Sequence, residues 1–304
     1  MRESEVSNRG RILRELLSEF TSNNLIGAKY RNGELRKKII EPNWKCPVGF
    51  SLEIIQLDNF SMEFLYKTDQ KSEKVILQLH GGGYVGGMRN AYRSFAKFYH
   101  KASHGANVLT IDYRVAPESP FPGAFEDAIE AYNWLIYKGF LPHNIILAGD
   151  SAGGGLAMAL CHYLRDNQRE LPAAIIAMSP WTDLSASGES YLTNYEIDPL
   201  FGNTKDSLIY NKDYVGESDV TNPYISPLYG AFDQFPPMLI QVGTHEMLLS
   251  DSTEVAQKAT QAGVKVKITI YEGMFHVFQM ARSLLPESRR AWAEIARFIN
   301  IIFK

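Results

Sequence analysis

The sequence contains little that would place it outside the ordinary globular proteins. It has two cysteines in 304 residues, Cys46 and Cys161, which is too few for a disulfide framework, so we expect free thiols and a cytoplasmic protein. Its 31 basic and 34 acidic residues give a net charge of −3, a balance that does not indicate nucleic acid or an anionic membrane as a partner. No apolar run reaches the ~18 residues that a membrane span needs. Residues 1–5 are charged and lack the apolar core of a secretory signal, so we expect none.

The apolar residues follow two different periods along the chain. Residues 52–57 and 60–66 alternate around Asp58-Asn59, as in an antiparallel hairpin. Short apolar runs follow at 74–79, 107–111, 144–148, 173–178, 238–242 and 264–271, and helical patterns lie at 89–104, 123–138, 152–167, 251–262 and 286–302. Alternating strands and helices favour a mostly parallel sheet that is covered on both faces. We therefore predict one α/β domain over residues 1–304, with a mixed sheet of eight strands flanked by helices.

Residues 181–235 interrupt this alternation. They are rich in Ser, Asn, Asp, Tyr and Pro and show no strong strand pattern. A segment of this length between two strands of a sheet is usually functional. Together with residues 1–45, which include an amphipathic pattern at 9–20, it is predicted to form a helical cap over the carboxyl edge of the sheet.

Ser151 lies in the pattern G-x-S-x-G, formed by residues 149–153, between an apolar strand and a helical run. A strand-to-helix turn this tight strains the backbone at the serine, and flanking glycines avoid clashes there. The turn lifts the hydroxyl clear of the sheet, and the start of the following helix favours developing negative charge. The alternative is a glycine-rich turn in which Ser151 only caps the helix. The junction of strand and helix favours a nucleophile.

A second glycine-rich loop, residues 80–83 (His-Gly-Gly-Gly), follows the strand predicted at 74–79. Acyl transfer builds negative charge on the former carbonyl oxygen, and prepositioned backbone N–H groups stabilise that charge by ~3 kcal/mol each. We expect the donors to be the N–H groups of Gly82 and Gly83, joined by that of Ala152 after the nucleophile. His80 is interpreted as a structural brace for this loop.

The same loop also matches a different kind of site. Gly81, Gly83 and Gly86 satisfy the dinucleotide fingerprint G-x-G-x-x-G, and Asp112 ends the next predicted strand. This interpretation leaves both the G-x-S-x-G pattern and a late histidine unexplained. A hydrolase accounts for all three features.

The general base has to be chosen among seven histidines. In a sheet of this kind the order along the chain is nucleophile, acid, then histidine, and the histidine lies on a loop after the last strand. Only His276 follows the strand predicted at 264–271, and we predict it to be the base. The others are His80, His100, His104, His143, His162 and His245.

The acid should follow the strand predicted at 238–242, where both Glu246 and Asp251 qualify. Asp251 comes after Ser250 at the start of a helical pattern, where an acid would cap free N–H groups. Glu246 lies nearer the end of the strand, on the loop that should face the histidine. We favour Glu246, whose task would be to orient the imidazole and stabilise its protonated form; Asp251 stays open as the alternative.

Four segments together resemble the hormone-sensitive-lipase-like family of esterases. They are residues 80–83 (HGGG), 112–122 (DYRVAPESPFP), 149–154 (GDSAGG) and 179–184 (SPWTDL). The resemblance covers nearly the whole chain from about residue 75 onwards. The family usually reads D-P-L-x-x-D in the acid loop, whereas here Glu246 and Met247 take the first two positions. The resemblance implies an α/β-hydrolase fold and hydrolysis of short acyl esters without a cofactor, often by a homodimer.

The expected function is therefore that of a carboxylester hydrolase acting on small ester substrates through a Ser-His-acid triad and an acyl-enzyme, with no metal. Tyr84, Phe275 and Phe278 are candidate walls of the substrate site, since they adjoin the predicted catalytic loops. Two alternatives use the same fold. One is a small-molecule binding protein without catalysis, which the presence of His276 disfavours. The other is a deacetylase or amidase for a specific metabolite, because the same triad serves amide chemistry.

Overall fold

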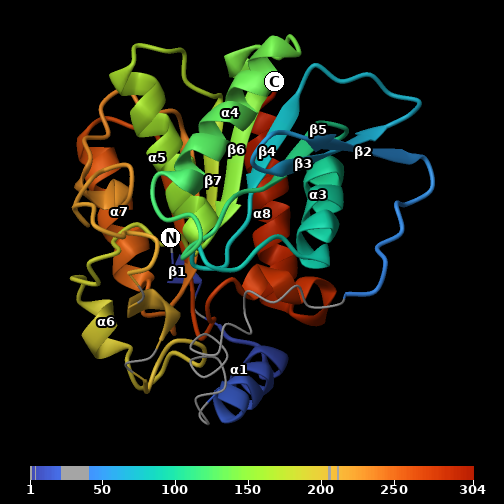
Figure 1. The fold of residues 1–304 in the computed structure, drawn as a ribbon. Helices are drawn as coiled ribbons and strands as arrows, with labels where there is room; N and C mark the ends of the chain where they lie inside the picture. Colours follow the sequence, from blue (N-terminus) through green and yellow to red (C-terminus); the bar gives the residue numbers. More distant parts are fainter. Residues whose placement is uncertain (1, 4, 22–40, 205–206, 211) are drawn as a thin grey trace.

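The computed structural model describes residues 2–3, 5–21, 41–204, 207–210 and 212–304. They form one sheet with helices on both of its faces (Figure 1). Of the predicted cap, residues 22–40 lie outside the described residues. The cap prediction can therefore be followed only through residues 2–3, 5–21, 41–45 and the described part of 181–235.

The eight strands expected from the sequence are all present, with ends that differ from the prediction by a few residues. They are β2 (Phe50–Gln56), β3 (Ser61–Lys67), β4 (Val75–Leu79), β5 (Asn107–Asp112), β6 (Ile145–Asp150), β7 (Ala174–Met178), β8 (Met238–Gly243) and β9 (Val266–Tyr271). A ninth strand, β1 (Arg2–Glu3), pairs in parallel with β9 at the edge of the sheet. Two residues are too few to produce a period in the sequence, so only the folded chain reveals this strand.

The strand order is β1-β9-β8-β7-β6-β4-β5-β3-β2. The pairs β2/β3 and β3/β5 are antiparallel, and all the other pairs are parallel. The leading hairpin thus makes the sheet mixed, as expected. Since β4, β6, β7, β8 and β9 run in the same direction, their carboxyl ends meet along one edge of the sheet.

The described helices lie on both faces of the sheet and beyond its carboxyl edge. They are α1 (Asn8–Thr21), α3 (Asn90–Ala102), α4 (Gly123–Tyr137), α5 (Ala152–Asp166), α6 (Ser190–Thr193), α7 (Leu249–Gln261) and α8 (Pro286–Ile302). The described connecting segments also contain four short 3₁₀ helices, which are η1 (Pro142–Asn144), η2 (Leu208–Tyr210), η3 (Pro227–Tyr229) and η4 (Phe278–Leu284). Helices α3 and α8 share one face, where the rings of Phe95 and Trp292 lie 5.2 Å apart. Helices α4, α5 and α7 share the other face.

The central strands are apolar at successive positions because both of their faces are buried. Val75, Leu77 and Leu79 of β4 point into the core formed with α4 and α5, while Ile76 points into the core formed with α3 and α8. All four side chains are fully buried. This explains why these strands read as continuous apolar runs rather than as an alternation.

Helix α1 and the part of the predicted cap around α6 lie beyond the carboxyl ends of the strands (Figure 1), whereas η3, near the end of the segment 181–235, lies beside α5 and α7. Arg14 of α1 donates a hydrogen bond from Nη1 to the carbonyl oxygen of Gly273, 3.0 Å away, on the loop after β9. In the other part, Leu208 lies so close to the glycine-rich loop that a Cβ at Gly83 would be 2.7 Å from its side chain. Both parts thus contact loops that carry predicted site residues.

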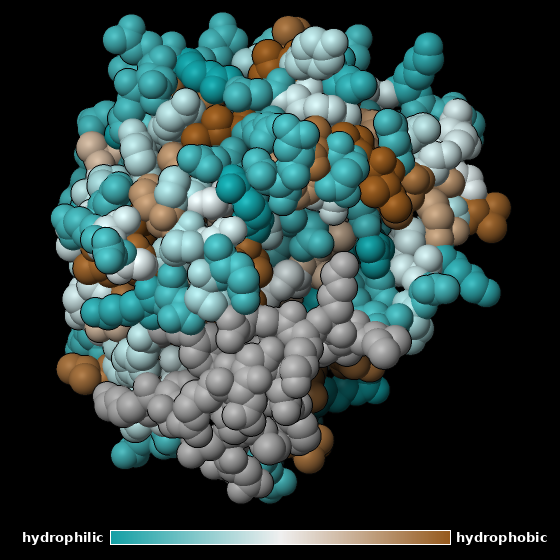
Figure 2. All heavy atoms as spheres, viewed as in Figure 1, coloured by the Kyte–Doolittle hydropathy of each residue, from teal (hydrophilic) through white to brown (hydrophobic). Residues whose placement is uncertain are grey.

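Among the helices that the structure describes, none is both long enough and apolar enough to cross a membrane. On the face shown in Figure 2 the described side chains are mostly hydrophilic, and hydrophobic ones lie in small separate patches. Both cysteines are free; Cys46 is exposed and Cys161 is buried.

One glycine of α5 should be indispensable for the packing of this helix on the sheet. A Cβ at Gly153 would lie 2.1 Å from the carbonyl oxygen of Leu79, which is backbone and cannot rotate away. We expect Gly153→Ala to lower the free energy of unfolding by about 3 kcal/mol or more, since the helix would have to shift from the sheet. Urea denaturation measures this. The control is Gly87→Ala, where the nearest atom to a new Cβ is 3.4 Å away; equal losses in the two variants would contradict the packing argument.

Candidate active site

Ser151 occupies a strained turn between β6 and α5. Its backbone has φ 53° and ψ −124°, a conformation that L residues rarely adopt. The turn is fixed by the N–H of Ser151, which donates to the carbonyl oxygen of Met178 at 2.9 Å. A Cβ at Gly149 would lie 2.3 Å from the carbonyl oxygen of Gly153, so the glycines of the pattern are required by space. Ser151 stands at the N-cap position of α5 but makes no side-chain capping bond, so the alternative of a mere capping serine is not supported.

The glycine-rich loop folds back on itself beside this turn. Gly82 and Gly83 have φ values of 117° and 62°, in the region that favours glycine. The N–H groups of Val85 and Gly86 donate to the carbonyl oxygen of Gly82 at 3.1 and 2.9 Å. Within the part of the chain that the structure describes, the N–H groups of Gly82 and Gly83 have no hydrogen-bond acceptor. That of Ala152, in the first turn of α5, has no acceptor within its helix.

Tyr92 of α3 holds the loop against the serine turn. Its hydroxyl accepts a hydrogen bond from the N–H of Gly81 at 2.9 Å and donates one to Oδ2 of Asp150 at 3.1 Å. A Cβ at Gly81 would lie 3.1 Å from the Cβ of Ser151. Burial raises the pKa of the Asp150 carboxyl to about 7, although the bond from Tyr92 and the attraction of His276 act in the opposite direction.

This loop does not have the form of a dinucleotide site. In such sites the glycines open directly onto the N-terminus of a helix, whereas here the next helix, α3, begins only at Asn90. Asp112 does not face a ligand site either, because its Oδ1 accepts the N–H of Met88 at 2.9 Å. The brace expected of His80 agrees with its placement: its ring is fully buried and stacks on Tyr113, with 3.9 Å between ring centroids.

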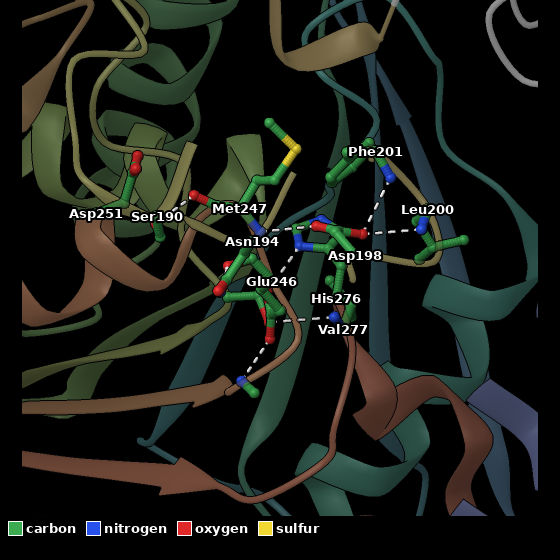
Figure 3. A network of polar contacts seen from close by, with 12 residues as sticks. Ser190, Asn194, Asp198, Leu200, Phe201, Glu246, Met247, Asp251, His276 and Val277 are labelled. Atoms are coloured by element: carbon green, nitrogen blue, oxygen red, sulfur yellow. Dashed lines mark hydrogen bonds and ion pairs between the residues drawn. The ribbon is translucent and has the colours of Figure 1, made fainter. Parts of the chain in front are cut away.

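His276 and Glu246 meet on the loops that follow β9 and β8 (Figure 3). Nδ1 of His276 lies 3.1 Å from Oε2 of Glu246. The other carboxylate oxygen of Glu246 accepts the N–H of Gly243 at 2.5 Å and the hydroxyl of Ser179 at 2.8 Å. Glu246 is fully buried and His276 is 8% exposed. A carboxylate fixed in this way holds Nδ1 as the protonated nitrogen and leaves Nε2 free to accept a proton.

Asp251, the alternative acid, is engaged elsewhere. It is buried in the first turn of α7, and its Oδ1 accepts the N–H groups of Thr182 and Asp183 at 2.7 and 2.9 Å. The carboxylate therefore fastens the start of the segment 181–235 to α7. Of the two acids that the sequence left open, Glu246 is the one hydrogen-bonded to His276.

Sequence reasoning missed three residues of the segment 181–235 that adjoin this pair. Asn194 donates from Nδ2 to the carbonyl oxygens of Glu246 and Thr244, at 2.7 and 3.0 Å. Asp198 accepts the N–H of Met247 at 2.7 Å, and the ring of Phe201 lies 4.7 Å from that of His276. No motif marks them. The only signal in the sequence is the unusual length of the irregular segment to which they belong.

The three aromatic residues expected to line the substrate site lie instead in the core. Tyr84 is 1% exposed and stacks on Tyr214, with ring centroids 3.8 Å apart. Phe275 and Phe278 are buried in a cluster with Tyr271. Their closeness in sequence to the loops was misleading, because these side chains turn inward from the loop backbone. Among the described residues, no group of three or more His, Cys, Asp or Glu side chains is placed to hold a metal ion.

A serine on a strained strand–helix turn, a glycine loop beside it and a carboxylate–imidazole pair on the following loops are the arrangement of an α/β hydrolase. A family model described as alpha/beta hydrolase fold matches residues 76–280. The chain is 37% identical to an acetyl-hydrolase of Streptomyces hygroscopicus over 89% of this chain and 91% of that one. It is 35% identical to an esterase of Acinetobacter venetianus over 76% of each chain.

The solved structures agree with these relatives. The crystal structure of an esterase from the bacterial hormone-sensitive lipase family superposes with a TM-score of 0.83 at 31% identity, over 99% of this chain and 100% of that one. The chain therefore belongs to the α/β hydrolases, and within them it is a hormone-sensitive-lipase-like esterase. The family resemblance and the fold predicted from the sequence are confirmed.

The buried carboxyl of Asp251 makes the stability of the protein depend on pH. Burial raises its pKa to about 8, whereas an exposed Asp titrates near 4. The folded chain then binds more protons than the unfolded chain between about pH 4 and 8, so this carboxyl lowers the free energy of unfolding as the pH rises through that range. We expect the melting temperature of Asp251→Asn, relative to the wild type, to rise between pH 5 and pH 8. A difference that stays constant or falls would contradict this.

Proposed function

We propose that the chain hydrolyses short-chain acyl esters through Ser151, His276 and Glu246. The observation that carries the proposal is the fixed pair of Glu246 and His276, which lies on the same sheet edge as the strained turn of Ser151. The relatives support the substrate class, since they include an acetyl-hydrolase and esterases. The alternative of a binding protein without catalysis is disfavoured, because such a protein would have no need for a strained serine on the same sheet edge as a fixed imidazole.

In the proposed mechanism the hydroxyl of Ser151 attacks the carbonyl carbon of the ester and its proton passes to Nε2 of His276. The C–O bond of the tetrahedral intermediate then breaks, and the imidazolium gives the proton to the leaving alcohol. Water, deprotonated by His276, then attacks the acyl-enzyme; the bond between the acyl carbon and Oγ of Ser151 breaks, the imidazolium returns its proton to Oγ, and the acid is released. Glu246 holds the imidazole in the required tautomer throughout and stabilises its protonated form.

The negative charge of each tetrahedral intermediate would be held by the N–H groups of Gly82, Gly83 and Ala152. This assignment is supported by the lack of another acceptor for the two glycine donors within the described residues, and by the start of α5 at Ala152, which favours negative charge. Donors that already point at the site need no reorganisation when the charge develops.

We further propose that residues 181–235 cover the site and limit the size of the substrate. Leu208 supports this, because it packs directly against Gly83 of the glycine loop. A side chain at that position restricts the space beside the developing oxyanion. This fits the short acyl group that the name of the Streptomyces relative implies.

The two free thiols support the proposal that the protein works in a reducing, cytoplasmic location.

The proposal predicts the activity of a small set of variants on p-nitrophenyl acetate, butyrate and octanoate. Ser151→Ala and His276→Ala should each lower kcat by on the order of 10³-fold or more, since each removes a group that forms or transfers a bond. Glu246→Gln should lower kcat by about 10²- to 10⁴-fold with little change in KM, because the amide no longer selects the tautomer. The acetate and butyrate esters should react faster than the octanoate.

The matched control is Asp251→Asn, which changes the other acid that follows β8, in the first turn of α7. It should keep most of the activity, because its partners are the N–H groups of Thr182 and Asp183 rather than His276. If Asp251→Asn lost as much activity as Glu246→Gln, the assignment of the acid would be wrong. A wild-type protein inactive on all three esters would overturn the proposed function.

A further inference from the structure

A second carboxylate, that of Asp198, lies beside His276 and comes from the segment 181–235. Asp198 is 3% exposed. Its Oδ1 accepts the N–H groups of Leu200 and Phe201 at 2.8 and 3.0 Å, and its Oδ2 accepts the N–H of Met247 at 2.7 Å. Three backbone donors therefore fix the carboxylate in one orientation, and none of them carries a full charge to neutralise it.

In Figure 3 Asp198 and Glu246 both lie in the surroundings of His276: Glu246 is hydrogen-bonded to the imidazole, and Asp198 accepts the N–H of Phe201, whose ring lies 4.7 Å from that of His276. Burial raises the pKa of Asp198 to about 6, and the three backbone hydrogen bonds and the attraction of His276 act in the opposite direction. Because a buried charge is screened only weakly, this attraction is stronger than it would be on the surface.

Among the described residues, carboxylates of three elements interact with His276. Glu246 lies on the loop after β8, Asp198 on the segment 181–235, and Asp150 at the end of β6. Asp150 is bonded to Tyr92 and is thereby tied to the glycine loop. Asp198 is bonded instead to Met247, the residue directly after Glu246. Of the two additional carboxylates, only Asp198 holds the loop that carries the acid.

We propose that Asp198 is a positioning residue for the reaction: its negative charge stabilises the protonated imidazole of His276, and its hydrogen bond to Met247 keeps Glu246 directed at that imidazole. This inference rests on the proposed function. It gives the segment 181–235 a second task besides covering the substrate, because the segment completes the electrostatic surroundings of the general base. Phe201, held by Asp198 through its N–H, packs against the same imidazole.

The test compares the pH dependence of kcat/KM for p-nitrophenyl acetate in the wild type, Asp198→Asn and Asp251→Asn. Without the charge of Asp198 the imidazolium is less stable, so the acidic limb of the Asp198→Asn profile should move to lower pH by about half a unit to one unit. Its plateau kcat should fall about tenfold with little change in KM. The acidic limb of Asp251→Asn should coincide with that of the wild type, although both variants alter a buried carboxylate that accepts backbone N–H groups.

Asp198→Ser is measured in parallel, because its hydroxyl can still accept the N–H groups of Leu200 and Phe201 if the asparagine variant does not fold. If the acidic limb of kcat/KM moves to lower pH in a variant that still melts cooperatively, the inference is supported. The inference is overturned if the acidic limb of either folded Asp198 variant stays at the pH of the wild type, or if the limb of Asp251→Asn shifts by the same amount. These outcomes leave the proposed function untouched as long as the wild type hydrolyses the ester and Ser151→Ala does not. An inactive wild type would instead reject the proposed function itself.

Discussion

The close approach of α5 to β4 and β6 is the constraint on which the rest of the site depends. It is possible because glycines stand where a Cβ would meet the carbonyl oxygens of Leu79 and Gly153, at 2.1 and 2.3 Å. This contact forces the chain through the strained turn at Ser151, and the strain is balanced by the packing of two buried layers around it. The same contact brings the glycine loop after β4 beside the serine, so one packing requirement places both the nucleophile and the proposed oxyanion donors.

The second organising feature is the way in which buried carboxylates are stabilised at the carboxyl edge of the sheet. Glu246, Asp198 and Asp251 are all buried, and each accepts at least one backbone N–H. Burying a carboxylate without partners costs several kcal/mol, so these bonds decide where each side chain can point. Asp198 connects the segment 181–235 to the loop that carries Glu246, and Asp251 connects the start of the segment to α7. The segment is thus fastened to the sheet edge by the same kind of group that is proposed to work in catalysis.

Much of the fold could be predicted from the sequence, because the period of apolar residues directly reports burial on one or both faces. Eight strands and the main helices follow from it. Predictions based on closeness along the chain were weaker: Tyr84, Phe275 and Phe278 adjoin the site loops, yet their side chains turn into the core. The two-residue strand β1 has no period to detect. Asp198 belongs to an irregular segment whose path depends on contacts with residues about 50 positions away.

By itself the sequence determined the reaction class and the residues proposed as nucleophile and general base. The glycine spacing records local backbone requirements, which are visible in a short stretch of chain, and the order of serine, acid and histidine follows the order of the strands that carry them. Only the tertiary structure decided which acid pairs with His276, because Glu246 and Asp251 are five residues apart and both follow the same strand. Their side chains point to different partners once α7 has packed on the sheet, and the orientation of a side chain depends on packing rather than on its position along the chain.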